Sequence, residues 1–108
     1  MVVASYLIKF RGESLKHFMA KSCLFYMLRE LKHDVISEFE LPETYIDLCD
    51  KTTMTFYEFE LTPTSPRLAV KVDKCNYVGY DLIIIDCREM PDDIYQMRMF
   101  LEKFFVPD

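Results

Sequence analysis

The chain has 108 residues, of which 51% are hydrophobic and 29% are charged, so it can fold as one domain around its own core and is not a disordered protein. Its net charge is −5, from 13 basic and 18 acidic residues, whereas strong non-specific nucleic-acid binders usually carry a basic excess. The two glycines, Gly12 and Gly79, are too few for a glycine-rich phosphate-binding loop.

The cysteines and the apolar runs indicate in which cellular compartment the protein is found. No two cysteines form a C-x-x-C pair, so they predict free thiols packed as small apolar groups rather than a zinc site. They are Cys23, Cys49, Cys75 and Cys87. No apolar run approaches the about 20 residues of a membrane span, and Met1 to Phe10 lacks the features of a signal peptide. We therefore expect a cytoplasmic protein without a membrane partner.

The first half of the chain predicts a helix between strands. Val2 to Phe10 is β-prone and predicts an extra N-terminal edge strand. A helix follows from Ser14, its N-cap, to about Lys32, with His17 and Lys21 on one flank. Its apolar stripe consists of Ala20, Leu24, Met27, Leu28 and Leu31. The next strand, Val35–Leu41, is expected to alternate, with Val35, Ser37, Phe39 and Leu41 on one face and Ile36, Glu38 and Glu40 on the other.

A β-hairpin and an α/β unit complete the predicted order. Tyr45–Asp50 and Met54–Leu61 are expected to pair around a two-residue turn at Lys51-Thr52. A helix from Pro66 to about Tyr77, with Ser65 as its N-cap, precedes Asp81–Cys87, an apolar run typical of a central buried strand. The last helix starts at Pro91 and has a core face of Ile94, Met97, Leu101, Phe104 and Phe105. This order predicts an α/β fold with helices around a mixed four-stranded sheet.

The hairpin carries the residues that suggest chemistry. With the Lys51-Thr52 turn, Asp47 would lie opposite Phe56, and Glu58 would be its diagonal neighbour, about 7–8 Å away by Cα. Two carboxylates at that separation can hold a hydrated Mg²⁺. Glu38, Glu40 and Glu60 would add further acids, and such crowding is destabilising without a cation. The alternative is that Glu58 and Glu60 simply face solvent from a one-sided sheet.

Four short motifs carry a family resemblance. They are Glu13-Ser14-x-x-His17-x-x-x-Lys21-x-x-Leu24, Val35-x-x-Glu38, Tyr45-Ile46-Asp47 and Tyr57-Glu58-Phe59-Glu60-Leu61-x-Pro63-x-Ser65. Together they resemble the PD-(D/E)XK, or restriction-endonuclease-like, superfamily, and among its members the competence-associated CoiA-like nuclease group. The match covers about residues 13–87, and the last helix would be an appendage to a single domain over residues 1–108.

The resemblance implies a fold and a reaction. The superfamily core is a helix, a three-strand meander, a helix and a fourth strand (αβββαβ), the order expected above. Its metal-binding positions match Asp47 and Glu58, so the implied activity is Mg²⁺- or Mn²⁺-dependent hydrolysis of DNA. Glu60 stands where the signature has lysine, and would act as a second ligand or as a base, while Lys71 is an alternative source of the cation. Glu38 would be an outer metal ligand.

Basic residues predict where DNA would lie. The helix over residues 66–77 aligns three of them on one face, which is either a solvated surface or a phosphate-binding one, and the first helix offers two more at the mouth of the acidic site. The predicted phosphate-binding residues are His17, Lys21, Arg67, Lys71 and Lys74.

Two other interpretations stay open at this point. Because some superfamily members without the lysine are inactive, the chain could be a non-catalytic interaction or DNA-binding module of a virus or mobile element, in which case the cytoplasm is the host's. A small DNA-binding regulator is the weaker option, since no helix-turn-helix or ribbon signature is present. We also expect a homodimer through the last helix, whose apolar residues on more than one side are Met97, Met99, Phe100, Phe104 and Phe105.

Overall fold

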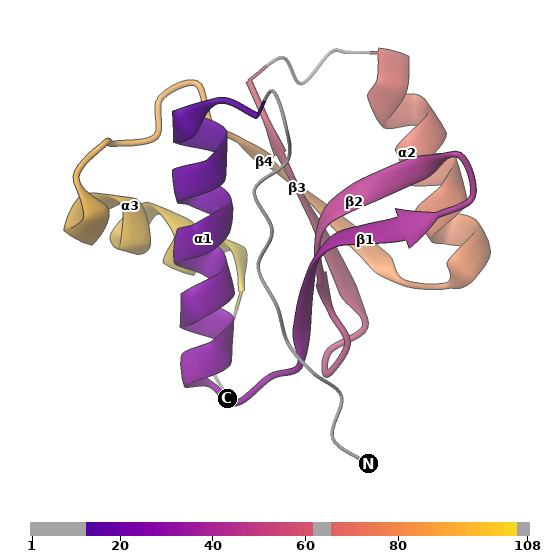
Figure 1. Cartoon of the computed structure of the whole chain (residues 1–108), viewed down its shortest axis with the longest axis horizontal. Coiled ribbons are helices and arrows are strands. Elements are labelled where there is room, and N and C mark those ends of the chain that lie inside the picture. Colours follow the sequence, from indigo (N-terminus) through magenta and orange to yellow (C-terminus); the bar gives the residue numbers. More distant parts are fainter. Residues whose placement is uncertain (1–12, 62–65, 106–108) are drawn as a thin grey trace.

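The computed structural model describes residues 13–61 and 66–105, which form one mixed sheet between helices (Figure 1). The elements are α1 (Leu15–Glu30), β1 (Val35–Leu41), β2 (Thr44–Asp50), β3 (Thr55–Glu60), α2 (Pro66–Val78), β4 (Asp81–Asp86), α3 (Ile94–Leu101) and a short 3₁₀ turn, η1 (Glu102–Phe104). This is the predicted order, and the α/β class is confirmed. The strand expected over residues 2–10 and the N-cap expected at Ser65 lie outside the described residues.

The sheet has the order β1-β2-β3-β4, with β2 antiparallel to both neighbours and β4 parallel to β3. Helices α1 and α3 cover one face and α2 covers the other (Figure 1). The expectation of a central position for β4 is wrong, because β4 is the edge strand of the sheet that the structure describes. Ile85 is fully buried but Ile84 is 36% exposed. A short apolar run therefore indicates a strand that is covered by helices, but it does not show whether that strand lies at the centre or at the edge of the sheet.

Helix α1 begins and packs as its sequence predicts. The Ser14 side chain accepts a hydrogen bond from the His17 backbone N–H at 3.1 Å, which satisfies one of the free donors of the first turn. Of the predicted stripe, four residues are buried and Leu31, the C-cap, is half-buried. The buried members are Ala20, Leu24, Met27 and Leu28. They belong to the core that α1 and α3 form with the sheet.

Helix α3 starts later than the sequence predicts. Pro91 precedes the helix, and the Asp93 carboxylate caps it by accepting hydrogen bonds from the backbone N–H groups of Tyr95 and Gln96. Met97 and Leu101 are buried as expected, whereas Ile94 is exposed and is not part of the core.

The β2–β3 turn is longer than expected. Asp50 pairs with Thr55, so the turn has four residues, Lys51 to Met54, instead of two. One oxygen of Asp50 accepts hydrogen bonds from the backbone N–H groups of Thr52 and Thr53, and Met54 adopts a left-handed φ of +56°. The other Asp50 oxygen lies 2.7 Å from His33 Nδ1 in the interior. A buried aspartate thus selects the wider turn through local backbone hydrogen bonds.

The first two strands change their packing partners halfway along. Val35 belongs to the core under α1, whereas Leu41 belongs to the second core, which faces α2, and Phe39 packs against that second core. The predicted common face for these three residues is therefore wrong. Glu38, at the point of change, has a left-handed φ of +53°, which breaks the simple alternation. Beyond it, the β1–β2 hairpin curves toward α2 (Figure 1).

The predicted free thiols are confirmed, because all four cysteines are buried and unbridged. In the described part of the chain, no helix is both long and apolar enough to cross a membrane.

We predict that Asp50→Ala lowers the free energy of unfolding by about 3 kcal/mol, because it leaves a buried histidine and two turn N–H groups without their acceptor. Urea denaturation at pH 7 measures this. Asp92→Ala is the matched control, since Asp92 is 89% exposed and its ion pair with Lys16 is long, at 3.8 Å. Equal midpoints for the two variants would contradict this role of Asp50.

The homodimer through α3 stays a prediction. Three apolar side chains on this helix are exposed, Ile94 by 51%, Tyr95 by 78% and Met99 by 68%. We expect sedimentation velocity at tens of micromolar to give a dimer, and Tyr95→Glu together with Met99→Glu to give a monomer, because charge cannot be buried cheaply in such a contact. A monomeric parent protein would refute the prediction.

Candidate functional site

Charged side chains from five parts of the chain meet on one flank of the sheet. They are Glu13, His17 and Lys21 at the start of α1, Glu38 on β1, Asp47 on β2, Glu58 on β3 and Lys71 on α2. We call this set the charge network. Lys21, Asp47 and Glu58 are buried and the other four members are half-buried, so the contacts within the network are screened less than they would be in water.

Asp47 and Glu58 lie where the hairpin separates. Strands β2 and β3 pair as far as Leu48 with Tyr57. Beyond that pair, Glu58 Oε1 accepts a hydrogen bond from the Asp47 backbone N–H at 2.8 Å, and Asp47 Oδ2 accepts one from the Phe59 backbone N–H at 2.8 Å. The two carboxylates thus take backbone hydrogen bonds that a regular ladder would have made.

The observed register corrects the predicted one. Its continuation sets Asp47 against Glu58, not against Phe56. The shift is an even number of residues, so it leaves both acids on the side of the sheet where the sequence had placed them, whereas a one-residue slip would have separated them.

Glu58 is the most deeply buried acid of the pair and has its own counter-ion. Its side chain is 1% exposed, and Lys71 Nζ donates to Oε2 at 2.8 Å. Burial and the nearby negative charge of Asp47 raise the pKa of Glu58 to about 7, although Lys71 acts in the opposite direction. Glu58 is therefore poised to gain or lose a proton near neutrality.

His17 is held between two acids. Its Nδ1 contacts Glu13 Oε2, and its Nε2 lies 3.1 Å from Asp47 Oδ2. Burial tends to lower the pKa of His17, but hydrogen bonds and charge attraction from Asp47 and Glu13 outweigh it and raise that pKa to about 9. The ring is consequently a cation at neutral pH, and both of its N–H groups donate.

Lys21 is an internal counter-ion. Its side chain is completely buried, and Nζ lies 2.9 Å from the Glu13 carboxylate and 2.6 Å from Glu38 Oε1. Burial raises the pKa of Glu38, and Lys21 opposes that rise. The sequence placed Lys21 on the correct flank of α1, beside His17, but a phosphate in solvent cannot reach it in this structure.

The crowding of acids is therefore relieved by the protein's own cations. The sequence argument held that like charges on neighbouring strands need a cation, and His17, Lys21 and Lys71 supply it. Glu13 joins two of these cations but received no role in the sequence interpretation. Its spacing of four residues from His17 was the available signal.

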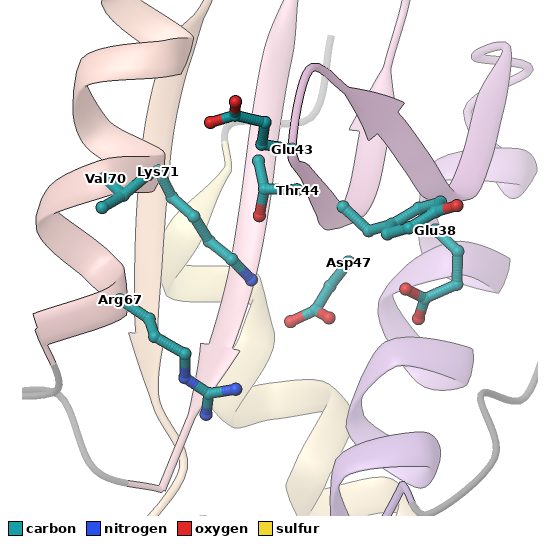
Figure 2. Close-up of a pocket in the computed structure, with 8 residues that line it drawn as sticks. Glu38, Glu43, Thr44, Asp47, Arg67, Val70 and Lys71 are labelled. Atoms are coloured by element: carbon teal, nitrogen blue, oxygen red, sulfur yellow. The ribbon is translucent and has the colours of Figure 1, made fainter.

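An open cavity of about 460 Å³ lies beside the charge network, between the β1–β2 turn and α2. Figure 2 shows Arg67 and Lys71 extending from α2, and Asp47 from β2, toward the same space. The full lining is Glu38, Glu43, Thr44, Tyr45, Asp47, Arg67, Val70 and Lys71. The hairpin residues of this lining, at 43–45, were missed because a turn sequence does not show which helix faces it.

Two predicted site residues lie elsewhere. Glu60 is at the end of β3, opposite Asp86 of β4, and lines neither the cavity nor the charge network. Lys74 is 3.8 Å from Glu43 and does not line the cavity. Among the residues that the structure describes, no group of three or more His, Cys, Asp or Glu side chains is arranged to hold a metal ion. The predicted ligand set of Asp47, Glu58 and Glu38 is thus not assembled here.

Comparison with protein-family models, curated proteins and solved structures finds no significant match to this chain. The PD-(D/E)XK resemblance therefore stays a prediction from the motifs.

The ion pairs of His17 with Glu13 and Asp47 predict that the stability of the protein depends on pH. The pKa of His17 rises on folding from 6.5 to about 9, so its protonation contributes stability fully below about pH 6.5 and loses that contribution as the pH rises through 9. We expect the stability difference between the parent protein and His17→Gln to shrink over this window. Urea midpoints at pH 6 and pH 9.5 measure it, and an NMR titration of the ring reports the pKa directly. A ring that titrates near 6.5 would contradict the ion-paired geometry.

Proposed function

We propose that this protein is a Mg²⁺- or Mn²⁺-dependent nuclease that hydrolyses DNA at the cavity beside Asp47. One observation carries the proposal: Asp47 and Lys71 line the same open cavity, and both hydrogen-bond to Glu58, which is buried behind them. The element order, which is that of the PD-(D/E)XK core, supports the same function.

The donor set of Asp47 and Glu58 fits a hydrated divalent ion in part. Asp47 lines the cavity, its Oδ2 is occupied by His17 and Phe59, and its Oδ1 has no hydrogen-bond partner among the described residues. Glu58 can add an oxygen once Lys71 moves away from it. Mg²⁺ commonly binds through one or two carboxylates and keeps several waters. A bound ion of this kind polarises a phosphoryl oxygen and lowers the pKa of its water.

The chain's own residues have separate tasks in this proposal. His17 and the Phe59 N–H hold Oδ2 of Asp47, which leaves Oδ1 for an ion in the cavity that Asp47 lines. Lys71 lines the cavity, and its ammonium group moves from Glu58 to pair with the phosphate. It thereby takes the role of the lysine in the family signature, whose position Glu60 occupies in this chain. Arg67 holds the same or a neighbouring phosphate.

The pKa of Glu58 connects this site to pH. At about 7, it means that Glu58 is only partly ionised at neutrality in the isolated protein. Since a carboxylate must be ionised to bind a metal, metal binding would release a proton and strengthen as the pH rises.

A second candidate function is a non-catalytic interaction or DNA-binding module on the same fold. The observation that favours it is the ion pairing of the network, in which Asp47, Glu38 and Glu58 all have protein cations as partners. A site neutralised in this way keeps its geometry without a metal.

We predict that the parent protein cuts DNA with Mn²⁺ and that Asp47→Asn cuts at least about 100-fold more slowly, because even outer partners of a metal ligand are worth about 10–100-fold. Lys71→Met should cost about 100–1,000-fold through lost stabilisation of transition-state charge. The assay covers single- and double-stranded, nicked and branched DNA. Asp92→Asn, a change at an exposed aspartate, is the matched control.

Titration calorimetry with Mn²⁺ separates the two candidates. Metal binding that Asp47→Asn abolishes supports the nuclease. Absence of cutting on every substrate, together with absence of Mn²⁺ binding, would overturn the nuclease in favour of the non-catalytic module.

A further inference from the structure

The cavity has two chemically different walls. On the α2 side lie Arg67, which is exposed, and Lys71, both with long cationic side chains (Figure 2). On the hairpin side lie Thr44 and Tyr45, and Tyr45 is 44% exposed. Three carboxylates, those of Glu38, Glu43 and Asp47, line the cavity as well. Basic side chains on one side and an aromatic ring on the other are features of sites that bind single nucleic-acid strands, in which phosphates follow the cations and bases stack on rings.

The size of the cavity favours one strand over two. At about 460 Å³ it lies in the lower part of the about 300–1,000 Å³ range of small-ligand pockets, which suits one nucleotide but not a base pair with both of its backbones. The β1–β2 hairpin curves toward α2 (Figure 1), and its residues 43–45 line the cavity on the side opposite that helix.

The distribution of charge favours the same choice. The chain carries −5 overall, and the cavity is lined by two basic and three acidic residues. Lys71 is ion-paired with Glu58, and Lys16, Arg88 and Arg98 elsewhere on the described surface are paired with other acids. Contact with many phosphates on both strands of a duplex is therefore not available, whereas one or two phosphates of a single strand can be held.

We infer that the cavity selects unpaired, single-stranded DNA, with one base stacked on Tyr45 and the adjoining phosphates on Arg67 and Lys71. This inference rests on the proposed function, since it places the phosphodiester next to Asp47, and it names the substrate class. Thr44 and Glu43 lie beside the stacked base, where a hydroxyl and a carboxylate can accept hydrogen bonds from its amino group.

Binding is measured apart from cutting, by fluorescence anisotropy in EDTA. The probes are a labelled 15-nucleotide strand, its duplex, and the same duplex with an unpaired overhang. We expect the single strand and the overhang to bind at least 10-fold more tightly than the blunt duplex. Tyr45→Ala should weaken single-strand binding by about 5–100-fold, as expected for loss of one stacked base, and Tyr45→Phe should restore it.

Two further variants sharpen the test. Tyr26→Ala, at a tyrosine on α1 that is 62% exposed and outside the cavity, should leave binding unchanged. Arg67→Ala should weaken binding and reduce the slope of log affinity against log salt by about 0.7, the value for one phosphate of a single strand. Urea midpoints equal to the parent's show that the variants are folded.

The outcomes distinguish this inference from the nuclease proposal. Equal affinity for the strand and the blunt duplex, or no effect of Tyr45→Ala, overturns the inference even if Mn²⁺-dependent cutting is present. Single-strand binding that depends on Tyr45, in a protein that neither cuts DNA nor binds Mn²⁺, supports the inference and refutes the nuclease.

Discussion

The rest of the site depends on one constraint: the carboxylates of Asp47 and Glu58 each accept a backbone hydrogen bond from the neighbouring strand, Glu58 from Asp47 and Asp47 from Phe59. Each carboxylate occupies a backbone N–H at the point where β2 and β3 stop pairing. A buried carboxylate that accepts backbone hydrogen bonds is held in one orientation, so the two acids are fixed before any ligand arrives. These two hydrogen bonds replace the ladder where the strands separate, and Asp47 lines the cavity beside that point.

Fixed acids in the interior require fixed cations, and the helices supply them. Helix α1 brings His17 and Lys21, and α2 brings Lys71. Removal of one partner would leave a buried charge uncompensated, which usually costs more than the intact pair contributes. The two helices are thereby held against opposite sides of the sheet by polar as well as apolar contacts. A change in the position of Lys71 would consequently alter the surroundings of Glu58, and through it those of Asp47.

Local rules account for the parts of the fold that the sequence predicted. Periodic apolar residues located α1, and alternation located the strands, because these patterns follow directly from helix and strand geometry. The register of the hairpin was missed because Asp50, one buried carboxylate, selected the longer turn. The reversal at Glu38 was missed because a left-handed residue other than glycine leaves no signature in composition.

The sequence predicted the acidic residues of the candidate site but not most of their cationic partners. The sequence placed Asp47 and Glu58 correctly on the same side of the sheet, although it gave the wrong register. A register shift of two residues leaves every side chain on its original side. Their cationic partners come from helices whose docking the sequence does not encode locally. Lys71 could be suggested as a substitute cation, but the depth of Lys21 and the exclusion of Glu60 depend on tertiary packing.

The buried cysteines divide evenly between the two layers of the core. Cys23 and Cys87 lie under α1 and α3, whereas Cys49 and Cys75 lie on the α2 side. Burial raises the pKa of each of these thiols, so little thiolate is present and alkylating reagents react slowly with the closed protein. Each layer thus contains its own chemical reporter. The rate at which a pair becomes labelled measures how often that layer opens, independently of the other.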